Sequence, residues 1–146
     1  MENIKESELV RIQSLIYEIR GYKVMVDRDL AKLYGVETKV LNQAVKRNIK
    51  RFPEDFMFQL THEECLRSQF VTLNTKQGHH LKYLPYAFTE QGVAMLSSVL
   101  RSDAAIEVNI RIMRAFVSIR NQIYAVKHLN SELETIKAKL ELLERN

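Results

Sequence analysis

The chain has 146 residues and a mass of 17.1 kDa, and 46% of its residues are apolar. This size and this apolar share suffice for one packed domain with an extension, and they exclude a disordered chain. The single cysteine, Cys65, excludes an internal disulfide framework, and no apolar run approaches the ~20 residues of a membrane-spanning helix. Because "MENIKESELV" at the start lacks the features of a secretory signal, we expect a cytoplasmic protein with no membrane role. The net charge of +4 is small, so the placement of charge is more informative than its sum.

The first third of the sequence predicts a hairpin followed by two helices. Two short β-favouring runs within residues 15–26 flank a turn at Arg20-Gly21. A short helix is expected over residues 27–35, capped by the aspartate at its start and ended by the glycine at its end. A second helix is expected over residues 38–51, because the residue before Pro53 disfavours the helical conformation.

The rest of the chain predicts further short elements and one long helix. A strand is expected over residues 55–60, and Thr61 opens a helix with an acid three residues later, the spacing of a capping box. Residues 70–88 predict a second hairpin with a polar tip. Thr89 is expected to cap the next helix, and Ser102 starts the longest one.

Together these elements predict an α+β fold with a helix-turn-helix core, short winged-helix-like β-hairpins and a long C-terminal helix that ends in a coiled-coil-like tail. No glycine- and proline-rich linker divides the chain. We assign residues 1–120 to the folded domain and residues 121–146 to a helical oligomerisation tail.

Residues 27–46 have the pattern of a helix-turn-helix. Ala31 is small enough for a second helix to cross closely over it, and Gly35 can adopt the positive φ that a tight turn needs. At 100° per residue, the second helix has one apolar face, made of Leu41, Ala44, Val45, Ile49 and Phe52.

The opposite face of that helix is polar and basic. Amides pair with adenine edges and lysines reach guanine, so this face predicts base readout by Thr38, Lys39, Asn42, Gln43 and Lys46. The alternative is an ordinary solvated helix face. Such a face usually mixes signs, whereas no acid occurs between Thr38 and Phe52.

Phosphate contacts are predicted around this face and at the tip of the second hairpin. The residues assigned to phosphates are Lys32, Arg47, Lys50, Arg51, Lys76, His79, His80 and Lys82. An ordinary polar loop is the alternative for the four tip residues. The tip histidines could also join His62 and Cys65 in a zinc site, but only if the two segments converge, so we assign no metal and no cofactor. Acids beside Cys65 would raise the pKa of its thiol, so we favour a buried apolar role over catalysis.

The long helix carries apolar residues along its whole length. Its first part has two apolar stripes and is expected to be buried on more than one side; the stripes are Ile106, Ile110, Met113 and Val117, and Val108, Ile112, Phe116 and Ile119. Further along, apolar residues alternate in steps of three and four, as in a coiled coil; we call these residues the seam, and they are Val126, Leu129, Leu133, Ile136, Leu140 and Leu143. The seam predicts a homodimer or a higher homo-oligomer. The alternative is a helix that packs back on its own domain.

Three segments of the chain resemble a known family. They are "IRGYKVMVDRDLAKLYGVETKVLNQAVKRNIKRFPEDFMFQLT", "LKYLPYAFTEQGVAMLSSVLRS" and "AIEVNIRIMRAFVSIR". Together they resemble the phage Orf-six N-terminal domain, which is related to the KilA-N and BRO N-terminal domains of phages, mobile elements and large DNA viruses. The resemblance implies a DNA-binding domain of phage regulators or antirepressors, and it implies no enzyme activity.

We therefore expect a sequence-specific double-stranded DNA-binding protein that regulates transcription for a phage or prophage. The rival hypothesis is an antirepressor that binds a repressor protein instead of DNA. A metal-dependent nuclease would need clustered carboxylates, which the sequence does not offer, and we expect no small-molecule substrate.

Overall fold

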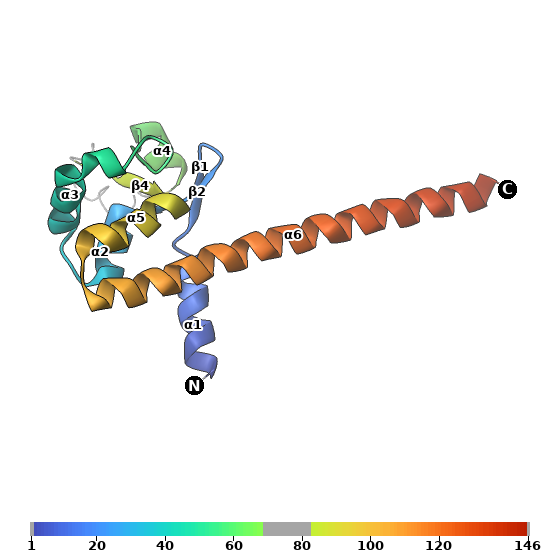
Figure 1. Ribbon diagram of the computed structural model, residues 1–146. Coiled ribbons are helices and arrows are strands. Elements are labelled where there is room, and N and C mark those ends of the chain that lie inside the picture. Colours follow the sequence, from blue (N-terminus) through green and yellow to red (C-terminus); the bar gives the residue numbers. More distant parts are fainter. Residues whose placement is uncertain (1, 69–82, 146) are drawn as a thin grey trace.

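The computed structural model of the chain describes residues 2–68 and 83–145 (Figure 1). In chain order, the elements are α1 (Glu2–Gln13), β1 (Tyr17–Ile19), β2 (Tyr22–Val26), α2 (Asp27–Tyr34), α3 (Thr38–Arg47), a 3₁₀ turn η1 (Ile49–Arg51), β3 (Met57–Gln59), α4 (His62–Arg67), β4 (Tyr86–Thr89), α5 (Glu90–Leu100) and α6 (Asp103–Arg145). The predicted α+β class is confirmed. Among the described residues, no helix is both long and apolar enough to cross a membrane.

The four strands form one antiparallel sheet in the order β1-β2-β4-β3. The expected first hairpin is confirmed, with Tyr17 opposite Val24. The expected second hairpin had its tip in residues 69–82, which lie outside the described residues. Its second arm contains β4, which inserts between β2 and β3 and pairs Phe88 with both Met25 and Met57. Segments far apart in the sequence therefore meet in the middle of the sheet.

Local signals at the helix ends decide where the elements begin and stop. Asp27 does not cap α2 as predicted: it is the first helical residue, and Val26 occupies the cap position. Thr61 forms the predicted capping box with Glu64, and the Thr89 hydroxyl accepts a hydrogen bond from the Gly92 amide. These two helix starts are confirmed.

Glu64 also joins α4 to the first hairpin. Both of its carboxylate oxygens accept hydrogen bonds from Arg20, at 2.8 Å from Nε and 2.9 Å from Nη2. Arg20 lies at the tip of the hairpin and its guanidinium also lies 4.3 Å from the centre of the Phe58 ring. The bonds from Arg20 lower the pKa of Glu64 to about 2, so this contact is fully charged near neutral pH.

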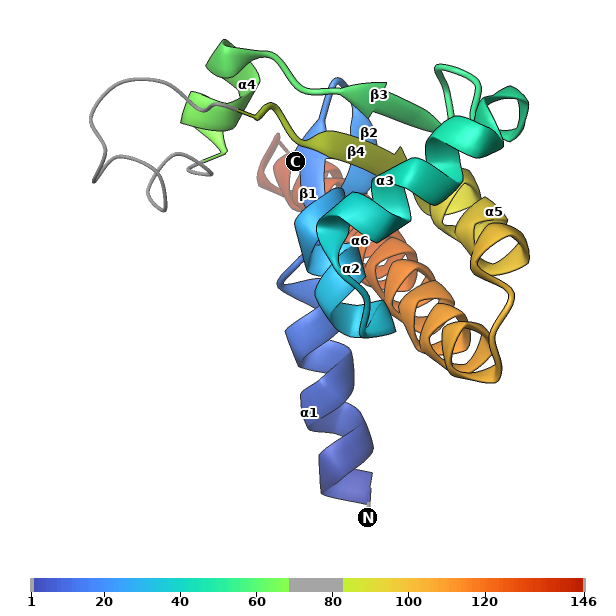
Figure 2. The same cartoon turned by 90° about the vertical axis from the view of Figure 1, so that its left-hand side faces the viewer.

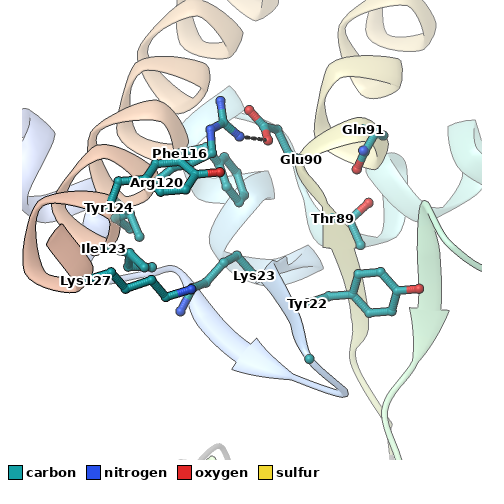
Figure 3. A pocket seen from close by; sticks show the side chains of 12 residues that line it. Tyr22, Lys23, Thr89, Glu90, Gln91, Phe116, Arg120, Ile123, Tyr124 and Lys127 are labelled. Carbon is teal, nitrogen blue, oxygen red and sulfur yellow. Dashed lines mark hydrogen bonds and ion pairs between the residues drawn. The ribbon is translucent and has the colours of Figure 1, made fainter. Parts of the chain in front are cut away.

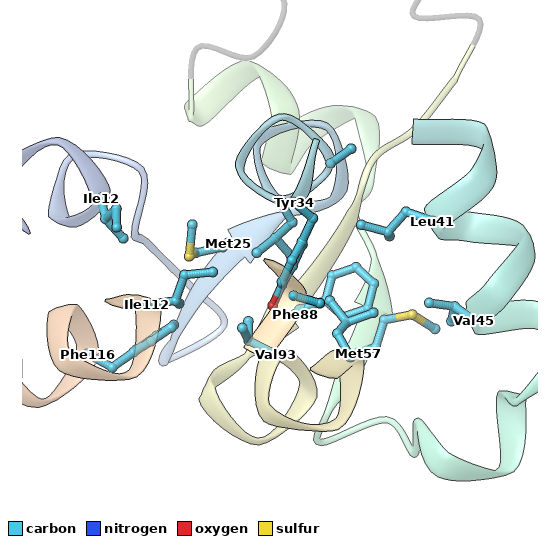
Figure 4. Close-up of a cluster of buried hydrophobic side chains, with 14 of the residues drawn as sticks. Ile12, Met25, Tyr34, Leu41, Val45, Met57, Phe88, Val93, Ile112 and Phe116 are labelled. Carbon is cyan, nitrogen blue, oxygen red and sulfur yellow. The ribbon is translucent and has the colours of Figure 1, made fainter. Parts of the chain in front are cut away.

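The main core lies between the sheet and helices α2, α3, α5 and α6 (Figure 4). Phe88 is fully buried near its middle and meets the ring of Phe52 edge-on, with ring centres 6.0 Å apart. Gly92 permits α5 to approach the chain before β3, because a Cβ at this position would lie 2.0 Å from the backbone oxygen of Phe56. The close approach holds α5 against the sheet.

Helix α6 has a packed first part and an exposed second part. Ala105, Ile112 and Ala115 are buried. The prediction that both apolar stripes are buried is wrong, because three members of the first stripe are 41% to 52% exposed, namely Ile106, Ile110 and Val117. From Arg120 to Arg145 every residue is exposed, so the tail does not pack back on its own domain, and Figure 1 shows it projecting as a rod.

The point where α6 leaves the domain is fixed by polar contacts with the sheet side of the molecule (Figure 3). Arg120 Nη1 lies 2.7 Å from the Glu90 carboxylate at the start of α5. A depression of about 290 Å³ lies between α6 and the first hairpin, with Tyr22, Lys23 and Tyr124 in its wall. Lys23 is paired with Glu18 at 2.9 Å.

Candidate nucleic-acid interface

Helices α2 and α3 form a compact corner around Gly35. Gly35 has φ of +71°, and the amides of Gly35 and Val36 donate to the carbonyls of Lys32 and Ala31 at 3.2 Å and 3.0 Å, the pattern of a Schellman ending. Leu30, Ala31 and Tyr34 of α2 and Leu41 and Val45 of α3 are buried between the two helices and the sheet. The predicted helix-turn-helix corner is therefore confirmed as a structure.

The apolar side of α3 follows the prediction except at its end. Leu41, Val45 and Phe52 are buried, but Ile49 is 52% exposed. The α-helix stops at Arg47, and the 3₁₀ turn that follows has fewer residues per turn, so the 100° spacing no longer applies.

The polar side of residues 38–51 faces outward. We call it the α3 face, and it consists of Thr38, Lys39, Asn42, Gln43, Lys46, Arg47, Lys50 and Arg51. In Figure 2 α3 lies at the front of the domain, turned away from the projecting end of α6. All five residues predicted for base readout surround one shallow depression of about 450 Å³, and Tyr83 completes its wall. Lys39, Gln43 and Lys46 are exposed, whereas Thr38 and Asn42 are half-buried at its edge.

The charges of the α3 face are not neutralised by the described part of the protein. Within residues 7–68 and 83–145, no carboxylate lies within 4.0 Å of the cations of Lys39, Lys46, Arg47 or Lys50. Arg51 donates a hydrogen bond to the Ser98 hydroxyl at 3.2 Å, a neutral partner on α5. Like charges in a row repel one another in water, and a polyanion would relieve that repulsion.

A buried aspartate anchors α3 from below. Asp27 is fully buried, and its carboxylate accepts hydrogen bonds from the Arg28 amide at 2.8 Å, from Asn42 Nδ2 at 3.0 Å and from the Tyr83 hydroxyl. Asn42 Nδ2 also donates to the Tyr83 oxygen. Burial, followed by the bond to Asp27, raises the pKa of Tyr83 above its ordinary value, so this hydroxyl keeps its proton.

This network changes the role that Asn42 can have. A two-bond contact with adenine needs an amide N–H as well as the amide oxygen. Asn42 Nδ2 already donates within the protein, to the Asp27 carboxylate and to the Tyr83 oxygen. Asn42 therefore helps to position α3, and the base contact assigned to it stays a prediction.

A family comparison covers this part of the molecule. A model of the ORF6N domain matches residues 14–99, more than half of the chain. The chain belongs to the ORF6N domain family. This is the phage-associated family that the sequence segments resemble, so that prediction is confirmed. No match was found among curated proteins or among solved structures.

The matched part of the ORF6N protein contains the whole sheet and the α2–α3 corner, and it ends before α6. The division at residue 120 between domain and tail stays a prediction, as do the contacts assigned to individual residues. Lys32 is exposed in the last turn of α2, beside the corner. The four tip residues Lys76, His79, His80 and Lys82 lie outside the described residues.

The remaining candidates of the ORF6N protein lie apart from the α3 face. Cys65 is fully buried in the smaller core cluster, and burial raises the pKa of its thiol. His62 is exposed at the start of α4. Over residues 2–68 and 83–145, no three side chains of the metal-binding types gather into one cluster.

Two residues of this ORF6N site were missed by the sequence analysis. Asp27 was expected only to cap a helix, and Tyr83 was placed in the arm of a hairpin. Tyr83 is 56 residues from Asp27, and no local pattern links the two. The sequence signal at Asp27 was its position at the start of a predicted helix, and that position suggested a helix cap.

Proposed function

We propose that this ORF6N protein binds double-stranded DNA by placing α3 in the major groove, and that it acts in the cytoplasm as a phage or prophage transcriptional regulator. The observation that carries this proposal is the α3 face: an outward row of lysines and arginines without acidic partners among the described residues. A helix of this kind fits the major groove of B-DNA, which is about 12 Å wide.

The proposed contacts divide by side-chain chemistry and position. Thr38, Lys39, Gln43 and Lys46 border the depression on α3 and are assigned to base edges. Gln43 is exposed and offers both an amide donor and an amide acceptor, so it is the residue assigned to adenine, and Asn42 keeps the base contact predicted for it. Lys32, Arg47, Lys50 and Arg51 flank the face and are assigned to phosphates; the hairpin-tip residues keep the same assignment as a prediction.

Tyr83 and Asp27 are proposed to fix the orientation of α3 on DNA. The Tyr83 ring borders the depression and remains 44% exposed while its hydroxyl is held by Asp27. Its exposed ring edge can contact thymine methyl groups, as apolar side chains do in the major groove. Positioning of this kind matters because a recognition helix reads bases only in a fixed register.

The test begins with selection of duplexes bound by the full chain from a random pool, followed by fluorescence anisotropy on the selected duplex and a scrambled one. Gln43→Ala should reduce the ratio of the two affinities by roughly tenfold or more, the loss of about 1–3 kcal/mol of base discrimination. Gln122→Ala, the same change on exposed α6, serves as the matched control. Failure to enrich any sequence, with equal affinity for both duplexes, would contradict sequence-specific binding.

The same preparation distinguishes the rival antirepressor role. A pull-down from host lysate is made with and without nuclease. A repressor that is retained after nuclease treatment, combined with no duplex binding at low salt, would replace DNA by a protein as the partner. Loss of captured material on nuclease treatment agrees with the proposal.

A further inference from the structure

The seam of α6 is a long apolar surface that nothing in the described part of the chain covers. Its six residues are 53% to 71% exposed. They follow one another at steps of three and four, which places them along one side of the helix. Apolar stripes of this length on a projecting helix are expected to bury against another helix.

The seam continues the side of α6 that the domain already covers. Counting back from Val126 in sevens gives Ile119, which is half-buried, and then Ile112 and Ala105, which are fully buried. Helix α1 packs along this first segment and its Gln13 donates to the Ser118 hydroxyl at 2.8 Å. The register therefore begins in the domain core and continues into the seam, with the polar Gln122 as its member between Ile119 and Val126.

We propose that the seam pairs with the seam of a second copy of this chain, in a parallel, in-register, two-stranded coiled coil. In heptad terms, Val126, Leu133 and Leu140 occupy the a positions, and Leu129, Ile136 and Leu143 occupy the d positions. The inference needs no DNA, and it stands or falls independently of the proposed function.

The charges beside the seam select the parallel orientation. In a parallel pair, each g position faces the e position five residues further along the partner helix. Glu132 would then face Lys137, and Lys139 would face Glu144, so all flanking charges attract. The remaining pair, Ala125 with Asn130, is neutral.

The narrowness of the seam selects two strands. Higher-order bundles bury wider stripes that include e or g positions, whereas here those positions are charged or polar apart from Ala125.

The folded domain also favours formation of this short coiled coil. Because residues 103–118 are held helical by packing, the unfavourable nucleation of the helix is already overcome where the seam begins.

A parallel pair would place both domains at one end of the coil, with both α3 faces directed away from it. Figure 1 shows α3 at the end of the molecule opposite the free end of α6. Two-fold pairing of this kind presents two copies of one surface to a symmetric partner.

The first test is sedimentation equilibrium of the full chain without DNA. We expect a dimer of twice 17.1 kDa. Leu140→Glu should raise its dissociation constant roughly a hundredfold or more, because it buries an unpaired charge in the seam. The control is Leu142→Glu: Leu142 is 63% exposed but lies off the seam, so the dissociation constant should stay within about threefold. A monomer at all concentrations, a trimer or tetramer, or equal effects of both changes would overturn the inference.

The second test is a charge exchange that separates the two orientations. Glu132→Lys alone should weaken the dimer roughly tenfold, since each Lys137 would then face a lysine. Adding Lys137→Glu should restore it in a parallel dimer. In an antiparallel dimer g faces g and e faces e, so the second change would give no rescue, and that result would overturn the parallel assignment.

Discussion

The α3 face and the seam of α6 are both exposed helix surfaces, but they differ in what they leave without a partner. The α3 face carries cations and no acid, from Thr38 to Phe52. The distal part of α6, from Arg120 to Arg145, carries four acids and five bases around an apolar stripe. Cations without acidic neighbours are suited to bind a polyanion. An apolar stripe that is flanked by both acids and bases is suited to pair with a second copy of the same helix. The charge pattern, more than the exposure, therefore indicates the kind of partner.

The two surfaces also differ in how the domain holds them. The α3 face rests on Leu41 and Val45, which are buried in the core, and on the bond from Asn42 to Asp27. The seam has no such support among the described residues, because every residue after Ile119 up to Arg145 is exposed. One surface is thus rigid before it binds, and the other gains its packing only from a partner.

The largest expected effect comes from removing the same side chain at these two places. Leu41→Ala should lower the free energy of unfolding by about 2–5 kcal/mol, because Leu41 is fully buried under α3. Leu129→Ala in dilute, monomeric protein should change it by less than about 0.5 kcal/mol. Urea unfolding followed by circular dichroism measures both. Equal losses would show that the tail packs on its own domain.

A smaller effect is expected from the anchor beneath α3. Asp27→Ala removes the carboxylate that accepts hydrogen bonds from Asn42 Nδ2 and from the Tyr83 hydroxyl, and it should cost about 1–3 kcal/mol of stability. Duplex affinity should fall as well, while the dimer constant of the seam should not change. Asp29→Ala, the next acid on α2, is the matched control. Unfolding curves and anisotropy that give the same values for both variants would remove Asp27 from its proposed role.

The smallest effect concerns a contact that belongs to neither surface. The pKa of Glu64 is about 2 in the folded chain, below its ordinary value of 4.5, because of its bonds with Arg20. A lowered carboxylate pKa stabilises the fold above the ordinary value, and that stabilisation is lost as the pH falls from 4.5 towards 2. It should amount to at most about 1 kcal/mol, since Arg20 is 43% exposed.

Urea unfolding between pH 7 and pH 2 checks this window. Glu64→Gln should lack this part of the acid dependence, whereas Glu63→Gln, the exposed neighbour, should keep it. Parallel pH profiles for Glu64→Gln and the unchanged chain would contradict the ion pair. Because α4 and the hairpin lie apart from both surfaces, neither duplex binding near neutral pH nor dimerisation should follow this titration.

Elements with local signals were predictable from the sequence, and contacts between distant segments were not. Gly35, Thr61 and Thr89 mark helix ends through their own backbone or hydroxyl chemistry, so their positions followed from the residues themselves. The insertion of β4 between β2 and β3 depends on pairing across long loops, which periodicity does not encode.

The candidate site shows the same division. Helical spacing predicted that five residues would share a surface on α3, and the structure brings all five together. Helical spacing could not predict that Tyr83 and Asp27 would form hydrogen bonds with the Asn42 amide, because those residues meet only in the folded chain. Ile49 was predicted to lie on the apolar face but is exposed, because α3 ends at Arg47. No glycine or proline in the sequence marks that helix end.

The most direct test of the central claim is the salt dependence of duplex binding. A plot of log affinity against log salt concentration should have a negative slope for the unchanged chain, and Lys50→Ala should reduce its magnitude by about 0.9, the contribution of one phosphate contact. Lys127→Ala, the same change on exposed α6, should leave the slope unchanged. A slope that both variants reduce alike, or that neither alters, would contradict DNA binding through the α3 face.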